Sequence, residues 1–173
     1  MRHRAVLAVA AGLLAAGCGV QRAQAPAPPA VADASRVDMC AMLTDAELTG
    51  LGVRLDSRKQ INQSGVVGCR WQGKPFTLSL ARDNDTVAGY RARRNDPGIL
   101  SFADNTVNGR AGAHLGVDRR GSQCAQLIDG GPVSLSVSVA LAANQAGTRP
   151  IDPCTEALRI AQRIEPRLPT VGS

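Results

Sequence analysis

The stretch that decides the fold is Val-Ser-Leu-Ser-Val-Ser-Val-Ala-Leu, residues 133–141. Its apolar residues alternate with serine and alanine along the whole stretch. A period of two places every second side chain on the same face of a β-strand, whereas it cannot form one apolar stripe along a helix. The stretch therefore predicts a long strand with one apolar face against a core and one face of small, mostly polar residues.

Further strands are expected before this one, each next to turn-forming residues. Asp129-Gly130-Gly131 separates the long strand from an apolar segment and is typical of a hairpin turn. Gln72-Gly73-Lys74 separates an earlier pair of segments in the same way. Asn108-Gly109 is a turn signal before a weaker strand. These four additional strands are expected at residues 66–71, 76–80, 111–117 and 123–128.

Three helices are also expected. Thr44 and Glu47 have the spacing of a capping box, in which each side chain accepts a hydrogen bond from the other residue's backbone. Asp152 is a candidate N-cap, with Pro153 at the first helical position. The helices are predicted at about residues 45–51, 86–94 and from 153 to just before Pro166. The fold class is therefore α+β: an antiparallel β-sheet of about five strands with about three helices packed against it.

The N-terminus has the features of an export signal. Arg2 and Arg4 precede an apolar segment at 5–14, and the small residues 15–17 lead directly to Cys18. This order resembles the lipobox of bacterial lipoprotein precursors, which implies cleavage before Cys18 and attachment of a lipid to its thiol. The alternative is an ordinary secretory signal with an Ala-x-Ala type cleavage site.

This interpretation divides the chain into four parts. Residues 1–17 are the predicted lipoprotein signal peptide, and 18–36 are the lipidated cysteine with a flexible linker rich in proline and alanine. Residues 37–169 form a single α+β envelope domain, and 170–173 form a tail. The expected location is the outer face of the cytoplasmic membrane, held there by the lipid anchor.

Four cysteines remain after Cys18: Cys40, Cys69, Cys124 and Cys154. An even number in an exported domain predicts two disulfides. Of the three possible pairings we favour Cys40–Cys69 with Cys124–Cys154, because each bond then closes a local loop in its own half of the domain. A four-cysteine zinc site is the alternative, but the Cys-x-x-Cys pair typical of such sites is absent.

The order of these motifs is similar to that of a known family. A cysteine precedes a capped helix at 40–51, Cys69-Arg70-Trp71 follows on a strand, and Asp152-Pro153-Cys154 opens the last helix. With the lipobox and the strand cysteine Cys124, this resembles the actinobacterial lipoproteins of domain-of-unknown-function family 3558. The resemblance implies an anchored envelope domain, and it implies no activity.

His114 is the one histidine after the signal segment, and a structural or surface role is favoured over a general base or metal ligand. Asp83 and Asp85 are interpreted as helix N-caps in preference to calcium ligands. Trp71 is expected to pack over the neighbouring disulfide, with a place in a ligand pocket as the alternative.

The charge of the chain excludes few classes of function. The net charge of +6 suits solubility or attraction to anionic polymers, and an exported domain is not expected to bind nucleic acid. Arg91, Arg93 and Arg94, with Arg119 and Arg120, are candidates for a basic patch, although a solvated helix face is favoured.

The sequence favours a non-catalytic binding or accessory module of the envelope, without enzyme activity, metal or cofactor, and expected to be a monomer. Its partner would be an envelope protein or wall polymer. The first alternative is a carrier of a small ligand or lipid, which needs a cavity lined by residues such as Phe76, Leu78, Leu135 and Val137. The second is an envelope enzyme with an unrecognised site.

Replacing the anchor residue tests the predicted location. The Cys18→Ala protein should move from the membrane fraction to the soluble fraction, because position 18 then has no thiol on which a lipid can be placed. Fractionation followed by immunoblotting measures this. Retention of the variant in the membrane fraction would contradict the anchor.

Overall fold

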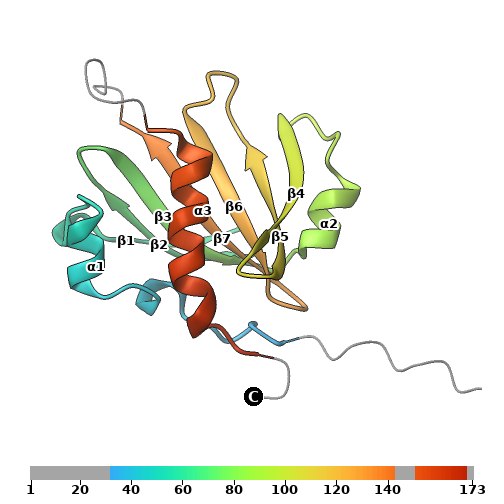
Figure 1. The fold of residues 1–173 in the computed structure, drawn as a ribbon, viewed down its shortest axis with the longest axis horizontal. Helices are drawn as coiled ribbons and strands as arrows, with labels where there is room; N and C mark the ends of the chain where they lie inside the picture. The colour runs from blue at the N-terminus through green and yellow to red at the C-terminus, as the bar shows by residue number, and fades with distance from the viewer. Residues whose placement is uncertain (1–31, 143–150, 171–173) are drawn as a thin grey trace, which may run out of the picture.

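The computed structural model describes residues 32–142 and 151–170, and these contain one antiparallel sheet with three α-helices (Figure 1). The sheet has seven strands in the order β1-β2-β3-β7-β6-β5-β4. The strands are β1 (Lys59–Gln63), β2 (Val66–Gln72), β3 (Phe76–Asp83), β4 (Ser101–Val107), β5 (Arg110–Gly116), β6 (Gln123–Asp129) and β7 (Ser134–Leu141). The helices are α1 (Asp45–Gly50), α2 (Val87–Ala92) and α3 (Pro153–Ile164), with short 3-10 turns η1 (Met39–Ala41), η2 (Leu55–Ser57) and η3 (Glu165–Arg167).

The α+β class is confirmed, but the expected number of about five strands is wrong. All five predicted strands are present, and β1 and β4 are additional. Both are edge strands joined to their neighbours by tight turns, at Ser64-Gly65 and Asn108-Gly109. Edge strands are largely exposed and so tolerate polar residues, which removes the apolar alternation that identifies a buried strand.

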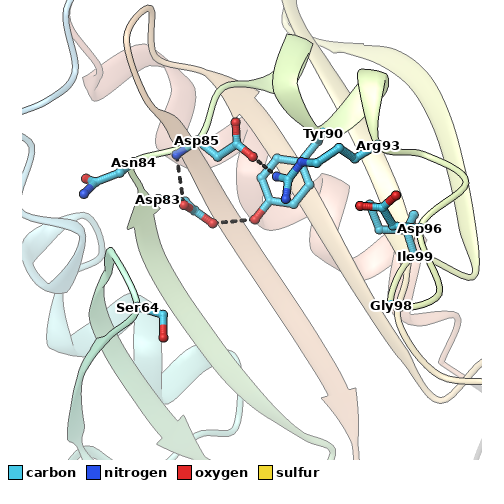
Figure 2. A pocket seen from close by; sticks show the side chains of 9 residues that line it. All are labelled: Ser64, Asp83, Asn84, Asp85, Tyr90, Arg93, Asp96, Gly98 and Ile99. Carbon is cyan, nitrogen blue, oxygen red and sulfur yellow. Dashed lines mark hydrogen bonds and ion pairs between the residues drawn. The ribbon is translucent and has the colours of Figure 1, made fainter.

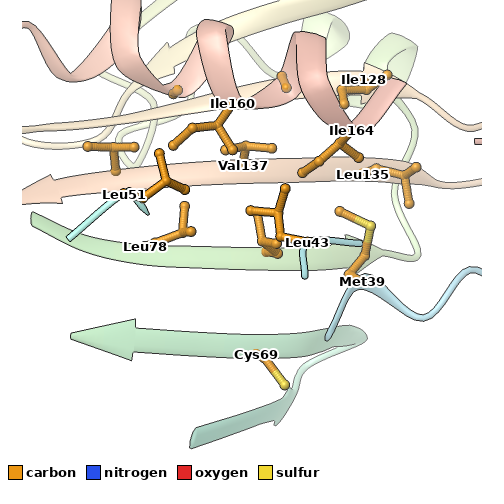
Figure 3. Close-up of a cluster of buried hydrophobic side chains, with 14 of the residues drawn as sticks. Met39, Leu43, Leu51, Cys69, Leu78, Ile128, Leu135, Val137, Ile160 and Ile164 are labelled. Atoms are coloured by element: carbon orange, nitrogen blue, oxygen red, sulfur yellow. The ribbon is translucent and has the colours of Figure 1, made fainter. Parts of the chain in front are cut away.

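The centre of the sheet is the pairing of β3 with β7. β1-β2-β3 and β4-β5-β6-β7 each form a series of hairpins, and the two series meet where Leu78 lies opposite Val139 and Leu80 opposite Val137. These side chains are fully buried beneath α3. Figure 3 shows Ile160 of α3 above Leu78 and Val137, within the same cluster. The core therefore occupies one face of the sheet.

Two disulfides fasten the covering elements to this sheet, in the favoured pairing. Cys40 of η1 is bonded to Cys69 of β2, and Cys124 of β6 is bonded to Cys154 of α3. Because the four sulfurs are bonded in two separate pairs, they do not form the alternative zinc site. Each bond holds one covering segment in its own half of the domain.

The opposite face of the sheet is only partly covered. Val87 of α2 packs with Ala113, Leu115 and Leu127 of β5 and β6. Among the described residues, α2 is the one α-helix that packs apolar side chains against that face. No α-helix of the described residues packs over the part of the face made by β1, β2, β3 and β7. We call this part of the surface the open face.

The predicted signal peptide, Cys18 and most of the predicted linker lie outside the described residues. Packing begins before Val37, because Ala34 is fully buried and its N–H donates to Gly130 O at 2.9 Å. Over the described ranges, no helix is both long enough and apolar enough to cross a bilayer.

An ion pair connects α1 to the C-terminal end of the domain and generates a pH-dependent prediction. The capping box is present, with Thr44 N donating to Glu47 Oε2 at 2.8 Å, and Arg167 Nη1 donates to the same oxygen at 2.9 Å. The hydrogen bond from Arg167 is the main cause that lowers the pKa of Glu47 from 4.5 to about 2.

Because the folded-state pKa is lowered, this stabilisation is present above about pH 4.5 and is lost as the pH falls through about 2. The Glu47→Gln variant should therefore lose less stability than the wild type between these two pH values, as measured by urea unfolding across this range. An equal loss in both proteins would contradict the assigned role of Glu47.

Candidate functional site

A polar pocket of about 680 Å³ lies where β3 leads into α2. Its walls come from the β1–β2 turn, the end of β3, α2 and the loop after α2. Figure 2 shows the lining side chains, which are Ser64, Asp83, Asn84, Asp85, Tyr90, Arg93, Asp96, Gly98 and Ile99. The pocket thus combines carboxylates, a guanidinium, an amide, hydroxyls and one aromatic ring.

Asp83 and Tyr90 form the inner wall of the pocket. The Tyr90 hydroxyl donates a hydrogen bond to Asp83 Oδ2, and the backbone N–H of Asp85 donates to Asp83 Oδ1 at 3.0 Å. Burial, followed by the hydrogen bond to Asp83, raises the pKa of Tyr90 well above its usual value of 10.0. The phenol therefore stays protonated in the alkaline range where a free tyrosine ionises, and its hydroxyl holds the carboxylate in place.

Asp85 and Arg93 form a second pair beside the first. Arg93 makes an ion pair with Asp85 Oδ2, and its guanidinium carbon lies 5.4 Å from the centroid of the Tyr90 ring. This placement allows a cation–π attraction. A Cβ on residue 89 would overlap Asp85 Oδ1, so the glycine there lets this carboxylate lie against α2.

The pocket has an excess of negative charge, although the whole chain is basic. Three carboxylates line it, from Asp83, Asp85 and Asp96, against the single guanidinium of Arg93. Asp96 makes no ion pair with any residue in the described ranges. The surplus of two carboxylates favours cationic groups of a ligand over anionic ones.

A second hollow, of about 270 Å³, continues from the pocket across the open face. It shares Asp83 and Tyr90 with the pocket. Its floor includes Ser79, Ser136 and Ser138, which are half-buried and point away from the α3 core. The small polar face expected from residues 133–141 is therefore the base of a groove.

Two interpretations of pocket residues change with the structure. Asp83 and Asp85 are not helix N-caps: Thr86 caps α2 by accepting from Gly89 N at 3.0 Å. The aspartates instead bind Tyr90 and Arg93. Arg91 forms an ion pair with Asp104 of β4 at 2.7 Å, so two of the three arginines near α2 are neutralised by carboxylates, which weakens the basic-patch interpretation.

The other candidates lie away from the pocket. Trp71 is 1% exposed and belongs to the same core cluster as Cys69, as expected for packing next to the disulfide. His114 is half-buried on β5, and its charge contributes to lowering the pKa of Asp152, after the dominant hydrogen bonds from Thr155. The structure does not bring His114 together with the residues of the pocket.

Sequence reasoning missed Tyr90 and did not connect Arg93 with Asp85. The available signal was that Tyr90 is the one tyrosine and lies one helical turn after Thr86, on the side of Val87 that packs against the sheet. The contact between Tyr90 and Asp83 depends on how α2 docks, which is a tertiary property.

Comparison with known proteins gives one result. The family model described as "Protein of unknown function (DUF3558)" matches residues 13–167 of the chain. No curated protein and no solved structure matches it.

The tyrosine provides a direct spectroscopic test of the inner wall. Since Tyr90 is the one tyrosine, absorbance at long ultraviolet wavelengths reports its ionisation alone. We expect ionisation well above pH 10.0 in the folded protein. In the Asp83→Asn variant the pKa should fall part of the way back, because the negative charge is removed while burial remains. Ionisation of the folded wild type at an ordinary tyrosine pKa would contradict the pairing.

Proposed function

The chain belongs to the family described as "Protein of unknown function (DUF3558)", and we propose that it is a lipid-anchored, non-catalytic binding module of the cell envelope. In this proposal the domain stands on the outer face of the cytoplasmic membrane. It binds a partner through the pocket beside α2 and the adjoining open face.

The observation that carries the proposal is how the polar groups of the pocket are arranged. Asp83 is held by Tyr90 and Asp85 by Arg93, so each of these carboxylates already has a fixed partner. Catalysis by nucleophilic attack needs a nucleophile next to a general base. Groups that are fixed by one another but face an open pocket instead suit recognition, because little side-chain freedom is lost when a ligand binds.

The anchor in this proposal rests on the N-terminal sequence. The basic and apolar segments, the small residues and Cys18 are in the order of a lipoprotein precursor. The family match begins at residue 13 and includes Cys18. The two disulfides suit an oxidising compartment outside the cytoplasm.

The carrier alternative is less favoured by the packing. Phe76, Leu78, Leu135 and Val137 are each at most 2% exposed and pack in the cluster beneath α3. In the described part of the chain, these side chains fill the space between sheet and helix. A carrier would therefore have to use the hollow of the open face, whose lining combines serine hydroxyls with apolar side chains such as Leu115 and Leu127.

Site-directed photocrosslinking in cells tests the binding module. A benzophenone amino acid in place of Asn84, which is exposed at the pocket, should form a defined adduct in the membrane fraction. The same group in place of Arg163, exposed on α3, is the matched control and should form no such adduct. Equal adducts at both positions, or none at position 84, would contradict the proposed binding surface.

A further inference from the structure

The open face has charged side chains at two separate places along its strands. Strand register puts Lys59 of β1, Arg70 of β2 and Ser79 of β3 side by side. Further along the same strands, Gln63, Val66 and Asp83 are side by side. Directly paired residues in an antiparallel sheet point to the same face. The two rows therefore project from one surface.

The first row is basic and has no carboxylate partner. Lys59 and Arg70 are both exposed, and neither makes an ion pair with any residue in the described ranges. Arg70 Nε donates to Ser79 Oγ at 3.4 Å, which is a long contact to a neutral group. This end of the surface therefore offers two cationic groups to a ligand.

The second row leads into the acidic pocket. Asp83 lines both the pocket and the hollow of the open face, and Asp85 and Asp96 lie beyond it. Ser79 and Asp83 are four residues apart on β3, and a strand rises about 3.3 Å per residue. The basic and acidic ends are thus separated by ~13 Å along the strand direction.

Between the two ends the surface is uncharged. Ile61, Gly68, Ala81 and Ser136 form the intervening row across β1, β2, β3 and β7. The small residues Gly68, Ala81 and Ser136 allow a ligand backbone to approach the sheet closely. The half-buried hydroxyls of Ser79, Ser136 and Ser138 can offer hydrogen bonds to that backbone.

We propose that the open face binds an extended peptide segment of a partner protein, which has an acidic and a basic side chain four residues apart. In an extended chain, residues four apart point to the same side and are separated by ~13 Å. The acidic side chain would lie at Lys59 and Arg70, and the basic one at Asp83 and Asp96. This inference rests on the proposed binding function and names its ligand class.

The place of the hollow decides between this occupant and a second copy of the chain. A second copy paired edge to edge along β1 would extend the sheet beside that strand and would leave the hollow over β2, β3 and β7 unfilled. A peptide with both charges is complementary to both ends of the groove. Self-association through β1 is therefore an outcome that would overturn the proposal.

Synthetic peptides of matched composition test the spacing. One has glutamate at its first and lysine at its fifth position in an alanine–serine background, and a second has the reverse order. The control has the same residues with glutamate and lysine three apart, which places them on opposite sides of an extended chain. Titration into the isotopically labelled mature protein, followed by NMR, gives affinity and location.

We expect one of the two peptides with charges four residues apart to bind about fivefold more tightly than the control. The control cannot form both ion pairs at once, and the loss of one exposed ion pair implies a factor of about this size. The shifted signals should be those of Ser79, Ala81 and Ser136. Arg70→Ser should weaken the binding of that peptide by about the same factor, whereas Arg163→Ser on α3 should leave its affinity unchanged. Arg70→Glu should reverse the preference towards a peptide with two lysines.

Equal affinity of the four-apart and three-apart peptides, or signal changes confined to α3, would overturn the peptide proposal. So would dimerisation that Asn62→Asp abolishes, since Asn62 lies on the exposed β1 edge. Failure of the peptide proposal remains distinct from failure of the proposed binding function. An adduct from position 84 without any dependence on peptide spacing would keep a binding module and reject this ligand class.

Discussion

The alternation of apolar and small residues along β7 determines both faces of the domain. β7 lies at the middle of the sheet, between β3 and β6. Leu135, Val137 and Val139 all point to one face and are fully buried. A shift of register by one residue would expose all of them, so the pairing of β7 is strongly specified. The same alternation directs Ser136 and Ser138 to the opposite face.

α3 covers one face of the sheet, and part of the other face stays open to solvent. α3 packs over the centre of the sheet and is bonded to β6 through Cys154 and Cys124. α2 is short and packs against β5 and β6 of the opposite face, and its Tyr90 reaches Asp83 at the end of β3. The contacts of Tyr90 with Asp83 at the end of β3 and with Arg93 after α2 then form a wall where the open face ends.

Much of this fold follows from local sequence, but the pocket does not. The buried strands, the capping box at Thr44 and the N-cap at Asp152 are confirmed because periodicity and capping are local properties. β1 and β4 were missed because an edge strand needs no apolar face. The disulfide pairing followed from loop size. The partners of Asp83 and Asp85 were assigned wrongly, because contact with Tyr90 and Arg93 depends on where α2 docks.

The central claim is that the open face is covered by a partner in the envelope while the α3 face is not. Single cysteines in place of Ser138, on the open face, and of Arg163, on α3, allow both faces to be compared by thiol labelling. In isolated envelopes, the thiol at position 138 should react more slowly than in the purified domain, and the thiol at position 163 should react at the same rate in both. Equal rates at position 138 in the two preparations would contradict the claim.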